Sequence, residues 1–181
     1  MSKVLIVVDM QNDFITGPLG TQEARDIIPN VQEKVQYYMK NEDGVIIFTR
    51  DSHDSFYMET QEGKHLPVPH CISKTEGWNI IPELNDYARN NFILNKNTFG
   101  YKYWEHVFDF RYNPVFISFD SIELVGVCTD ICVVSNALIL KSIYPEIPII
   151  VDATCCAGTT PENHIAALQV MKCCQIEVKE N

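Results

Sequence analysis

The sequence is poor in basic residues and contains no cluster of them. Lysine and arginine number 14 against 24 aspartate and glutamate residues, which gives a formal net charge of −10. A surface of this charge repels phosphate backbones and anionic lipid headgroups. We therefore expect neither nucleic acid nor a membrane surface to be a partner.

Long apolar runs and a recognisable leader are also missing. No stretch approaches the roughly 20 consecutive apolar residues that span a bilayer, and Met1-Ser2-Lys3 runs directly into Val4 without the regions of a signal peptide. The seven cysteines are an odd number without the spacing of a disulfide scaffold. We expect a cytoplasmic protein with reduced thiols.

Repeats and low-complexity linkers are absent, and residues 1–181 suit one domain. Short β-branched bursts are typical of buried parallel strands, and stretches with helical spacing, such as Pro29 to Asn41 and Pro161 to Cys173, lie between some of them. This alternation predicts a Rossmann-like three-layer α/β/α fold with a mostly parallel six-stranded sheet. The expected strands are Val4 to Val8, Val45 to Phe48, Phe92 to Leu94, Ile122 to Val127, Ile147 to Val151 and Ile176 to Val178.

Chemically versatile side chains follow the ends of four expected strands, where sites form in open parallel sheets. They are Asp9, Asp51, His53, Lys96 and Cys132. The long irregular stretch from Arg50 to Gly77 contains two of them, and a loop of that size is usually functional.

Cys132 is the candidate nucleophile. We expect it in the first turn of the helix after the fourth strand, where free N–H groups favour a thiolate and can stabilise an oxyanion. From the residues alone, cysteines such as Cys128 and Cys132 are more often small core side chains. Their spacing also permits half of a metal site, but no second thiol pair with matching spacing exists.

Asp9 and Lys96 are the candidate partners of that thiol. Asp9 follows four apolar residues and can exchange a proton with the cysteine and the leaving group, although it can also simply cap a turn. Lys96 can keep Asp9 ionised and lower the pKa of the thiol, although a lysine at a strand end is most often solvated.

Four motifs in this order resemble the isochorismatase-like cysteine hydrolases, and within them the nicotinamidases. The motifs are V-V-D-M-Q-N-D-F from Val7, T-R-D-S-H from Thr49, N-K-N-T-F from Asn95 and G-V-C-T-D-I-C-V from Gly126. The resemblance implies a catalytic triad of Asp9, Lys96 and Cys132 and the fold of that family. It also implies a cis peptide between Val127 and Cys128 and an oxyanion hole formed by the N–H groups of Cys128 and Cys132.

The Arg50 to Gly77 stretch offers two imidazoles and two carboxylates that can enclose zinc, iron or manganese, although surface loops often contain such residues without a metal. The resemblance implies a divalent metal, with zinc as the first expectation, held by Asp51, His53, Glu62 and His70. The usual third ligand of that family is a histidine. Here Glu62 takes that position, with Glu59 and His65 as competitors.

Phe14, Phe99 and Tyr101 are the expected walls for a flat aromatic substrate, although aromatic side chains near strand ends are often core residues. The resemblance implies an amidohydrolase that converts nicotinamide to nicotinate and ammonia through a cysteine thioester. Hydrolysis of a carbamoyl or ureido amide or of isochorismate is the alternative within the family, and a non-catalytic metal-binding or redox protein is the alternative outside enzymes. The family also implies a homo-oligomer.

Overall fold

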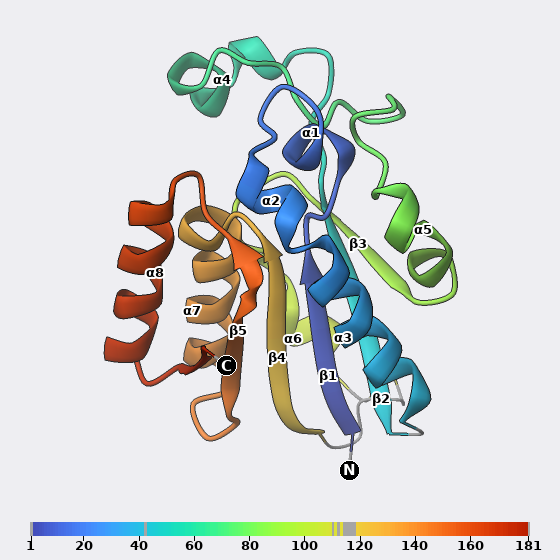
Figure 1. Ribbon diagram of the computed structural model, residues 1–181, viewed down its shortest axis with the longest axis vertical. Coiled ribbons are helices and arrows are strands. Elements are labelled where there is room, and N and C mark those ends of the chain that lie inside the picture. Colours follow the sequence, from blue (N-terminus) through green and yellow to red (C-terminus); the bar gives the residue numbers. More distant parts are fainter. Residues whose placement is uncertain (1, 42, 110, 112, 114–118, 181) are drawn as a thin grey trace.

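The computed structural model describes residues 2–41, 43–109, 111, 113 and 119–180. One sheet with the strand order β3-β2-β1-β4-β5-β6 forms its centre, and every pairing in it is parallel (Figure 1). The predicted six-stranded parallel sheet is therefore confirmed. Its strands are β1 Ser2–Val8, β2 Gly44–Asp51, β3 Phe92–Lys96, β4 Phe119–Val127, β5 Ile149–Ala157 and β6 Glu177–Lys179.

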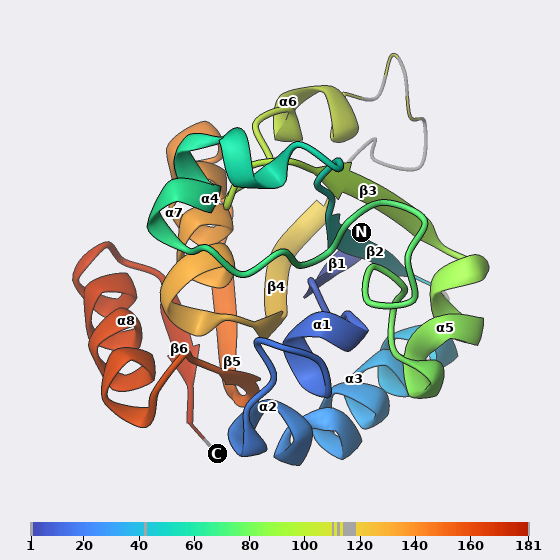
Figure 2. The same ribbon diagram turned by 90° about the horizontal axis from the view of Figure 1, so that it is seen from above.

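Helices cover both faces of the sheet, as Figure 2 shows from above. α2, α3 and α5 lie on one face, and α6, α7 and α8 lie on the other. The helices are α1 Asn12–Ile15, α2 Gln22–Asp26, α3 Ile28–Lys40, α4 Gln61–His65, α5 Pro82–Arg89, α6 Trp104–Val107, α7 Val134–Ile143 and α8 Pro161–Cys173. A 3-10 turn, η1 Tyr57–Glu59, and a π-helical turn, η3 Thr129–Val133, complete the described elements.

The apolar strands are buried on both faces because side chains alternate along a strand. In β1, Val4 and Ile6 belong to the cluster that includes α7 and α8, whereas Leu5 and Val7 belong to the cluster that includes α3. This two-sided burial explains why the strands appear in the sequence as continuous β-branched runs.

Most strand bounds differ from the predicted ones by one to three residues, and two differences are larger. β5 continues to Ala157, six residues beyond the apolar burst, because Asp152 is partnered within the fold: its Oδ2 lies 2.6 Å from Lys34 Nζ. The stretch from Arg50 to Gly77 is not wholly irregular, since it contains η1 and α4. Both helical pieces are shorter than two turns, which leaves no clear periodicity in the sequence.

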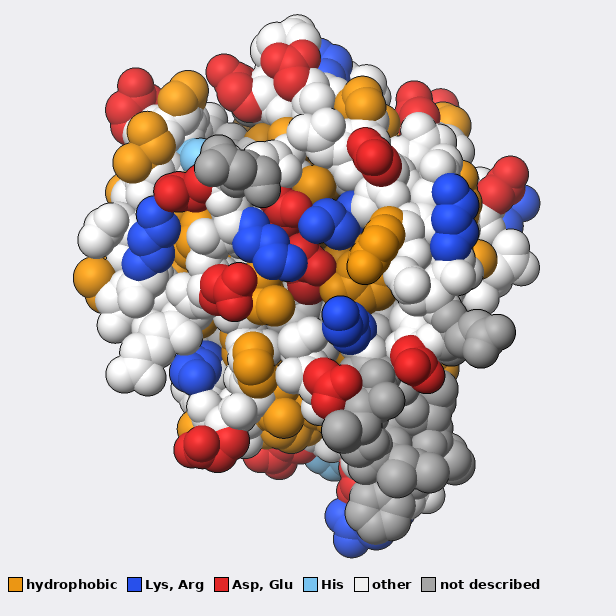
Figure 3. Space-filling model, turned by 60° about the horizontal axis from the view of Figure 1, so that its bottom comes forward, with side chains coloured by type: hydrophobic (Ala, Val, Ile, Leu, Met, Phe, Trp, Pro, Cys, Tyr) orange, Lys and Arg blue, Asp and Glu red, His pale blue; other side chains and the backbone are white. Residues whose placement is uncertain are grey.

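A group of paired charges lies on the α3 side of the sheet. Glu123 of β4 accepts hydrogen bonds from Lys34, Tyr38 and Lys179. These residues and Asp152 border a hollow of about 610 Å³, and Figure 3 shows lysine and acidic side chains gathered together on the face that it views. Their charges are already neutralised by one another.

The strand order reverses between β1 and β4, and this reversal positions the site. Gly126, near the end of β4, has φ of +115°, and a Cβ there would collide with the backbone of Val8. A side chain would therefore separate β4 from β1 next to Asp9. No helix in the described ranges is long and apolar enough to cross a bilayer.

Candidate active site

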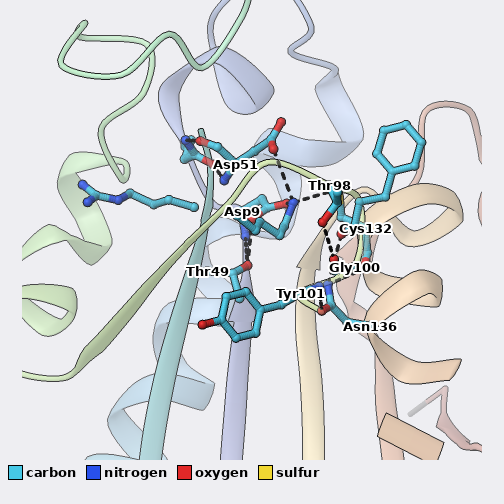
Figure 4. A network of polar contacts seen from close by, with 12 residues as sticks. Asp9, Thr49, Asp51, Thr98, Gly100, Tyr101, Cys132 and Asn136 are labelled. Atoms are coloured by element: carbon cyan, nitrogen blue, oxygen red, sulfur yellow. Dashed lines mark hydrogen bonds and ion pairs between the residues drawn. The ribbon is translucent and has the colours of Figure 1, made fainter. Parts of the chain in front are cut away.

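Asp9, Lys96 and Cys132 meet at the carboxyl end of the sheet. Lys96 Nζ lies 2.6 Å from Asp9 Oδ2 and 3.5 Å from Cys132 Sγ. All three side chains are buried. Lys96, at the end of β3, therefore contacts both the carboxylate after β1 and the thiol after β4. Figure 4 shows Asp9 and Cys132 within this network of polar contacts.

Asp9 is held in an unusual backbone conformation by its contacts. Its φ is +50°, in the left-handed region that non-glycine residues rarely adopt. The Thr49 hydroxyl donates to Asp9 Oδ1 at 2.7 Å and accepts from the Asp9 N–H at 3.3 Å. Burial raises the pKa of Asp9, and the charge of Lys96 opposes that rise. A carboxylate balanced in this way is suited to accept and return a proton.

Cys132 lies in the π-helical turn η3, two residues before α7 begins, rather than in the first turn of an α-helix. Burial raises its thiol pKa well above the ordinary value, and the Lys96 ammonium only partly offsets this. Burial therefore opposes the thiolate that the sequence favours, whereas the charge of Lys96 supports it. Lys96 links the Cys132 thiol to the Asp9 carboxylate, since its ammonium contacts both side chains.

The peptide between Val127 and Cys128 is cis, as the family resemblance implies. Cys128 and Cys132 both line the same cavity. An oxyanion hole formed by their N–H groups stays a prediction.

The four expected metal ligands converge. One ligand atom from each of Asp51, His53, Glu62 and His70 lies within 4.8 Å of the others. His53 Nε2 lies 2.9 Å from Asp51 Oδ2 and 3.6 Å from Glu62 Oε1. His70 Nε2 lies 3.5 Å from Asp51 Oδ2 and 3.7 Å from Glu62 Oε1.

The chemistry of this donor set fits a divalent cation. His70 Nδ1 contacts the carbonyl of Val68 at 2.8 Å, which orients Nε2 toward the group, as is usual for metal-binding histidines. Although burial opposes it, His53 and His70 hold the pKa of Asp51 well below its usual range. Burial raises the pKa of Glu62, and a cation would offset that penalty.

The competing ligands lie outside this group. Glu59 and His65 are exposed, and His65 Nδ1 contacts the Gln61 carbonyl at 2.9 Å. Tyr57 supports two of the candidate ligands by packing. Its ring lies edge-on against the rings of His53 and His70, with centroids 4.7 and 5.0 Å away. Its hydroxyl donates to the Leu66 carbonyl at 2.9 Å, which ties η1 to the end of α4.

A cavity of about 310 Å³ opens above the thiol. Phe14 and Phe99 line it, whereas Tyr101 does not and packs instead against Trp104 at 5.1 Å between ring centroids. The structure therefore brings two of the three expected aromatic walls to the cavity. Sequence reasoning missed further lining residues because neither motif nor periodicity distinguishes them, namely Leu19, Thr21, Leu66, Ile131 and Thr159.

Similarity to known proteins extends over almost the whole chain. The chain is 29% identical to a nicotinamidase/pyrazinamidase of Mycobacterium tuberculosis, over 97% of each chain, and 27% identical to a probable inactive nicotinamidase of Arabidopsis thaliana, over 93% and 87%. The structure superimposes on a crystal structure of nicotinamidase PncA from Bacillus subtilis with a TM-score of 0.81, at 26% identity over 99% and 100% of the two chains. The isochorismatase domain model matches residues 3–179, and the chain therefore belongs to the isochorismatase domain family.

Proposed function

We propose that this chain, acting as one domain, is an amidohydrolase that cleaves nicotinamide to nicotinate and ammonia. The observation that carries the proposal is the position of Lys96 Nζ, 2.6 Å from Asp9 Oδ2 and 3.5 Å from Cys132 Sγ, below a cavity of small-molecule size. A thiol, a base and an orienting cation form a nucleophilic set of this kind.

The first half of the reaction forms a thioester. Asp9 takes the thiol proton of Cys132 as sulfur attacks the amide carbonyl carbon, and the carbonyl oxygen becomes an oxyanion. The C–N bond then breaks, the nitrogen receives the proton from Asp9, and ammonia leaves. Lys96 stabilises the negative charge, which passes between sulfur and carboxylate.

The second half releases the acid. Asp9, ionised again, takes a proton from a water that attacks the thioester carbonyl. The C–S bond breaks, and the proton on Asp9 returns to the sulfur of Cys132. The products are the carboxylic acid and the original thiol.

A divalent metal is the proposed cofactor, and two imidazoles with two carboxylates suit zinc, with iron and manganese as alternatives. Asp51, His53, Glu62 and His70 would hold it. Bound there, it would act as a Lewis acid toward a neutral ring nitrogen or water.

The lining of the cavity favours a neutral ring amide over the family's acidic substrates. Apolar side chains such as Phe14, Leu66 and Ile131 dominate it, and no lysine or arginine is among its described lining residues. Lys96 below is already paired with Asp9. A free carboxylate on the substrate would lie among mostly apolar described lining residues, where the only cation is the proposed metal, whose charge Asp51 and Glu62 already neutralise, and this costs affinity.

Ammonia release is the direct test, with nicotinamide, pyrazinamide and N-carbamoylsarcosine as substrates for the parent and for Cys132→Ala. Cys173→Ala is the matched control because Cys173 is exposed at the end of α8. We expect turnover of the two ring amides, loss of it in Cys132→Ala alone, and negligible turnover of the carboxylate-bearing amide. Turnover of the last substrate alone, or of none by metal-loaded protein, would overturn the proposal in favour of another branch or a non-catalytic protein.

We further propose a cytoplasmic location and association with other copies of the chain. Both follow from the composition and the family rather than from the geometry. Sedimentation of the purified protein at several concentrations tests the second, and a single monomeric species throughout would refute it.

A further inference from the structure

We propose that Asn136 is a positioning residue that clamps the loop between Lys96 and Trp104 against the turn that carries Cys132. The proposal rests on the proposed function in one respect, that Cys132 is the nucleophile. Asn136 lies in the first turn of α7, is fully buried and does not line the cavity. Within the described residues, its amide makes no hydrogen bond to the side chain of Asp9, Lys96 or Cys132. It thus acts through the segments that it joins.

The side-chain amide of Asn136 makes four hydrogen bonds. Its Oδ1 accepts from the Tyr101 N–H at 2.8 Å and from Trp104 Nε1 at 2.9 Å. Its Nδ2 donates to the carbonyl of Cys132 at 2.7 Å and to that of Phe99 at 3.3 Å. Figure 4 shows Asn136 between Cys132 and Tyr101.

These four bonds use the whole hydrogen-bonding capacity of an asparagine, which has two donors and two acceptor lone pairs. They also fix the orientation of the amide, because the two donors of the loop face one end and the two carbonyls face the other. A buried network that is fully satisfied is rigid and specifies one arrangement.

The clamped loop connects two parts of the site. It begins at Lys96, whose ammonium contacts Cys132 Sγ, and it includes Phe99, which lines the cavity. The loop also lies directly against α7 at Gly100, where a Cβ would collide with Ile139 and crowd Ser135. The Thr98 hydroxyl donates to the Gly100 carbonyl at 2.7 Å and braces the same bend.

The separation of Lys96 and Cys132 therefore depends on both strand β3 and this clamp. Without the amide, four polar groups in two buried and two part-buried hydrogen bonds lose their partner, and the loop must move to hydrate them. Such movement carries Lys96 away from the sulfur and disturbs the wall at Phe99. The amide's contribution is consequently geometric, since it adds no charge to the site.

The test compares two variants of this position. Asn136→Thr retains a hydroxyl that can bond the Cys132 carbonyl four residues earlier, as threonine commonly does in helices, but it cannot reach the loop. Asn136→Leu removes both halves of the clamp at similar volume. Trp104→Phe removes a single bond to Oδ1 and keeps an aromatic ring.

The main readout is the rate of Cys132 alkylation by iodoacetamide at fixed pH, followed by peptide mass spectrometry well below the unfolding midpoint. This rate requires no amide substrate, so it tests the clamp even if the proposed function fails. We expect a tenfold or larger fall in Asn136→Thr, a matching fall in kcat/KM for nicotinamide, and a smaller fall in Trp104→Phe. The variant that combines Asn136→Thr with Trp104→Phe should show a smaller fold-reduction in alkylation rate than the product of the two single reductions, because both substitutions remove the same contact.

Ser142→Ala is the matched control, since Ser142 makes an i−4 bond to the Leu138 carbonyl on an exposed part of the same helix. It should leave the alkylation rate unchanged. The proposal would be overturned if Cys132 in a folded Asn136→Thr protein were alkylated at a rate within twofold of the parent rate. It would also be overturned if the falls in alkylation rate in all Asn136 variants only matched the fraction of unfolded protein, because that result indicates a purely structural role.

Discussion

Asp51 Oδ1 lies 3.6 Å from Lys96 Nζ, while Asp51 Oδ2 lies 2.9 Å from His53 Nε2. One carboxylate therefore touches both Lys96, the proposed catalytic lysine, and the candidate metal ligands. The cation site and the nucleophilic set share a residue, so a change at Asp51 reaches both.

Asp51→Asn should therefore have two separable effects. We expect metal affinity to fall at least 10-fold to 100-fold, as changes around metal ligands do, and activity to stay low when metal is restored in excess. Asp54→Asn is the control, because exposed Asp54 only caps the Phe56 N–H in the same loop. Calorimetric titration with zinc and ammonia release measure the two effects, and full recovery with excess metal would show that the contact with Lys96 is unimportant.

Thr49→Val should shift the acid limb of the kcat/KM profile to higher pH. The Thr49 hydroxyl lowers the pKa of Asp9, which burial raises, so loss of the hydroxyl raises that pKa further. Asp9 must be ionised to act as base, and the ionised fraction at a given acidic pH then falls. Thr49→Ser retains the hydroxyl and should keep the parent profile. If the acid limb of the kcat/KM profile were the same in Thr49→Val and in the parent, this would argue against Asp9 as the base.

Phe99→Ala should raise KM for nicotinamide about tenfold with little change in kcat. Phe99 is 47% exposed and lines the cavity, so its ring is available to cover a bound substrate. Loss of one aromatic contact of this kind costs about 1 kcal/mol or somewhat more. Phe56→Ala is the control because Phe56 is 63% exposed and is not among the lining residues. Steady-state kinetics measure KM for nicotinamide in both variants. Equal KM values in Phe99→Ala and Phe56→Ala would show that Phe99 is not part of the binding wall.

Glu123→Gln should destabilise the fold near neutral pH and have little effect in acid. Although burial opposes it, Tyr38 and Lys34 hold the pKa of Glu123 below its ordinary value. The charged form thus stabilises the fold above the unfolded-state pKa of about 4.3, and this contribution disappears as the pH falls through the lower folded-state pKa. We expect a loss of about 1–3 kcal/mol at pH 7.

Urea unfolding of parent and Glu123→Gln at pH 7 and at progressively lower pH checks this linkage. Glu177→Gln, on exposed Glu177 of β6, is the control and should lack the effect. A difference between parent and Glu123→Gln that persists undiminished in acid would contradict it.

Much of the fold could be predicted because its determinants are local. Buried parallel strands such as β1 and β4 require β-branched runs, and these are visible without the structure. The extension of β5 was not visible, because the ion pair that helps to accommodate Asp152 in a strand comes from Lys34, which is distant in sequence. Short α4 also lacked a periodic signal.

The candidate site divides in the same way. Asp9, Lys96 and Cys132 stand in motifs next to strand ends, and their convergence follows from a parallel sheet. The raised pKa of Cys132 could not be foreseen, since it depends on burial that only the packed structure establishes. Asn136 escaped notice for a related reason: its four partners come together only in the fold.

The nucleophilic role of Cys132 is the central claim, and a trapped intermediate tests it most directly. Metal-loaded protein is mixed with excess nicotinamide, quenched in acid within one turnover, and analysed by intact and peptide mass spectrometry. We predict a mass increase of one nicotinoyl group on the peptide that contains Cys132, absent in Cys132→Ala and present in Cys173→Ala. Rapid release of ammonia without an acyl group on that peptide, or undiminished turnover by Cys132→Ala, would contradict the account.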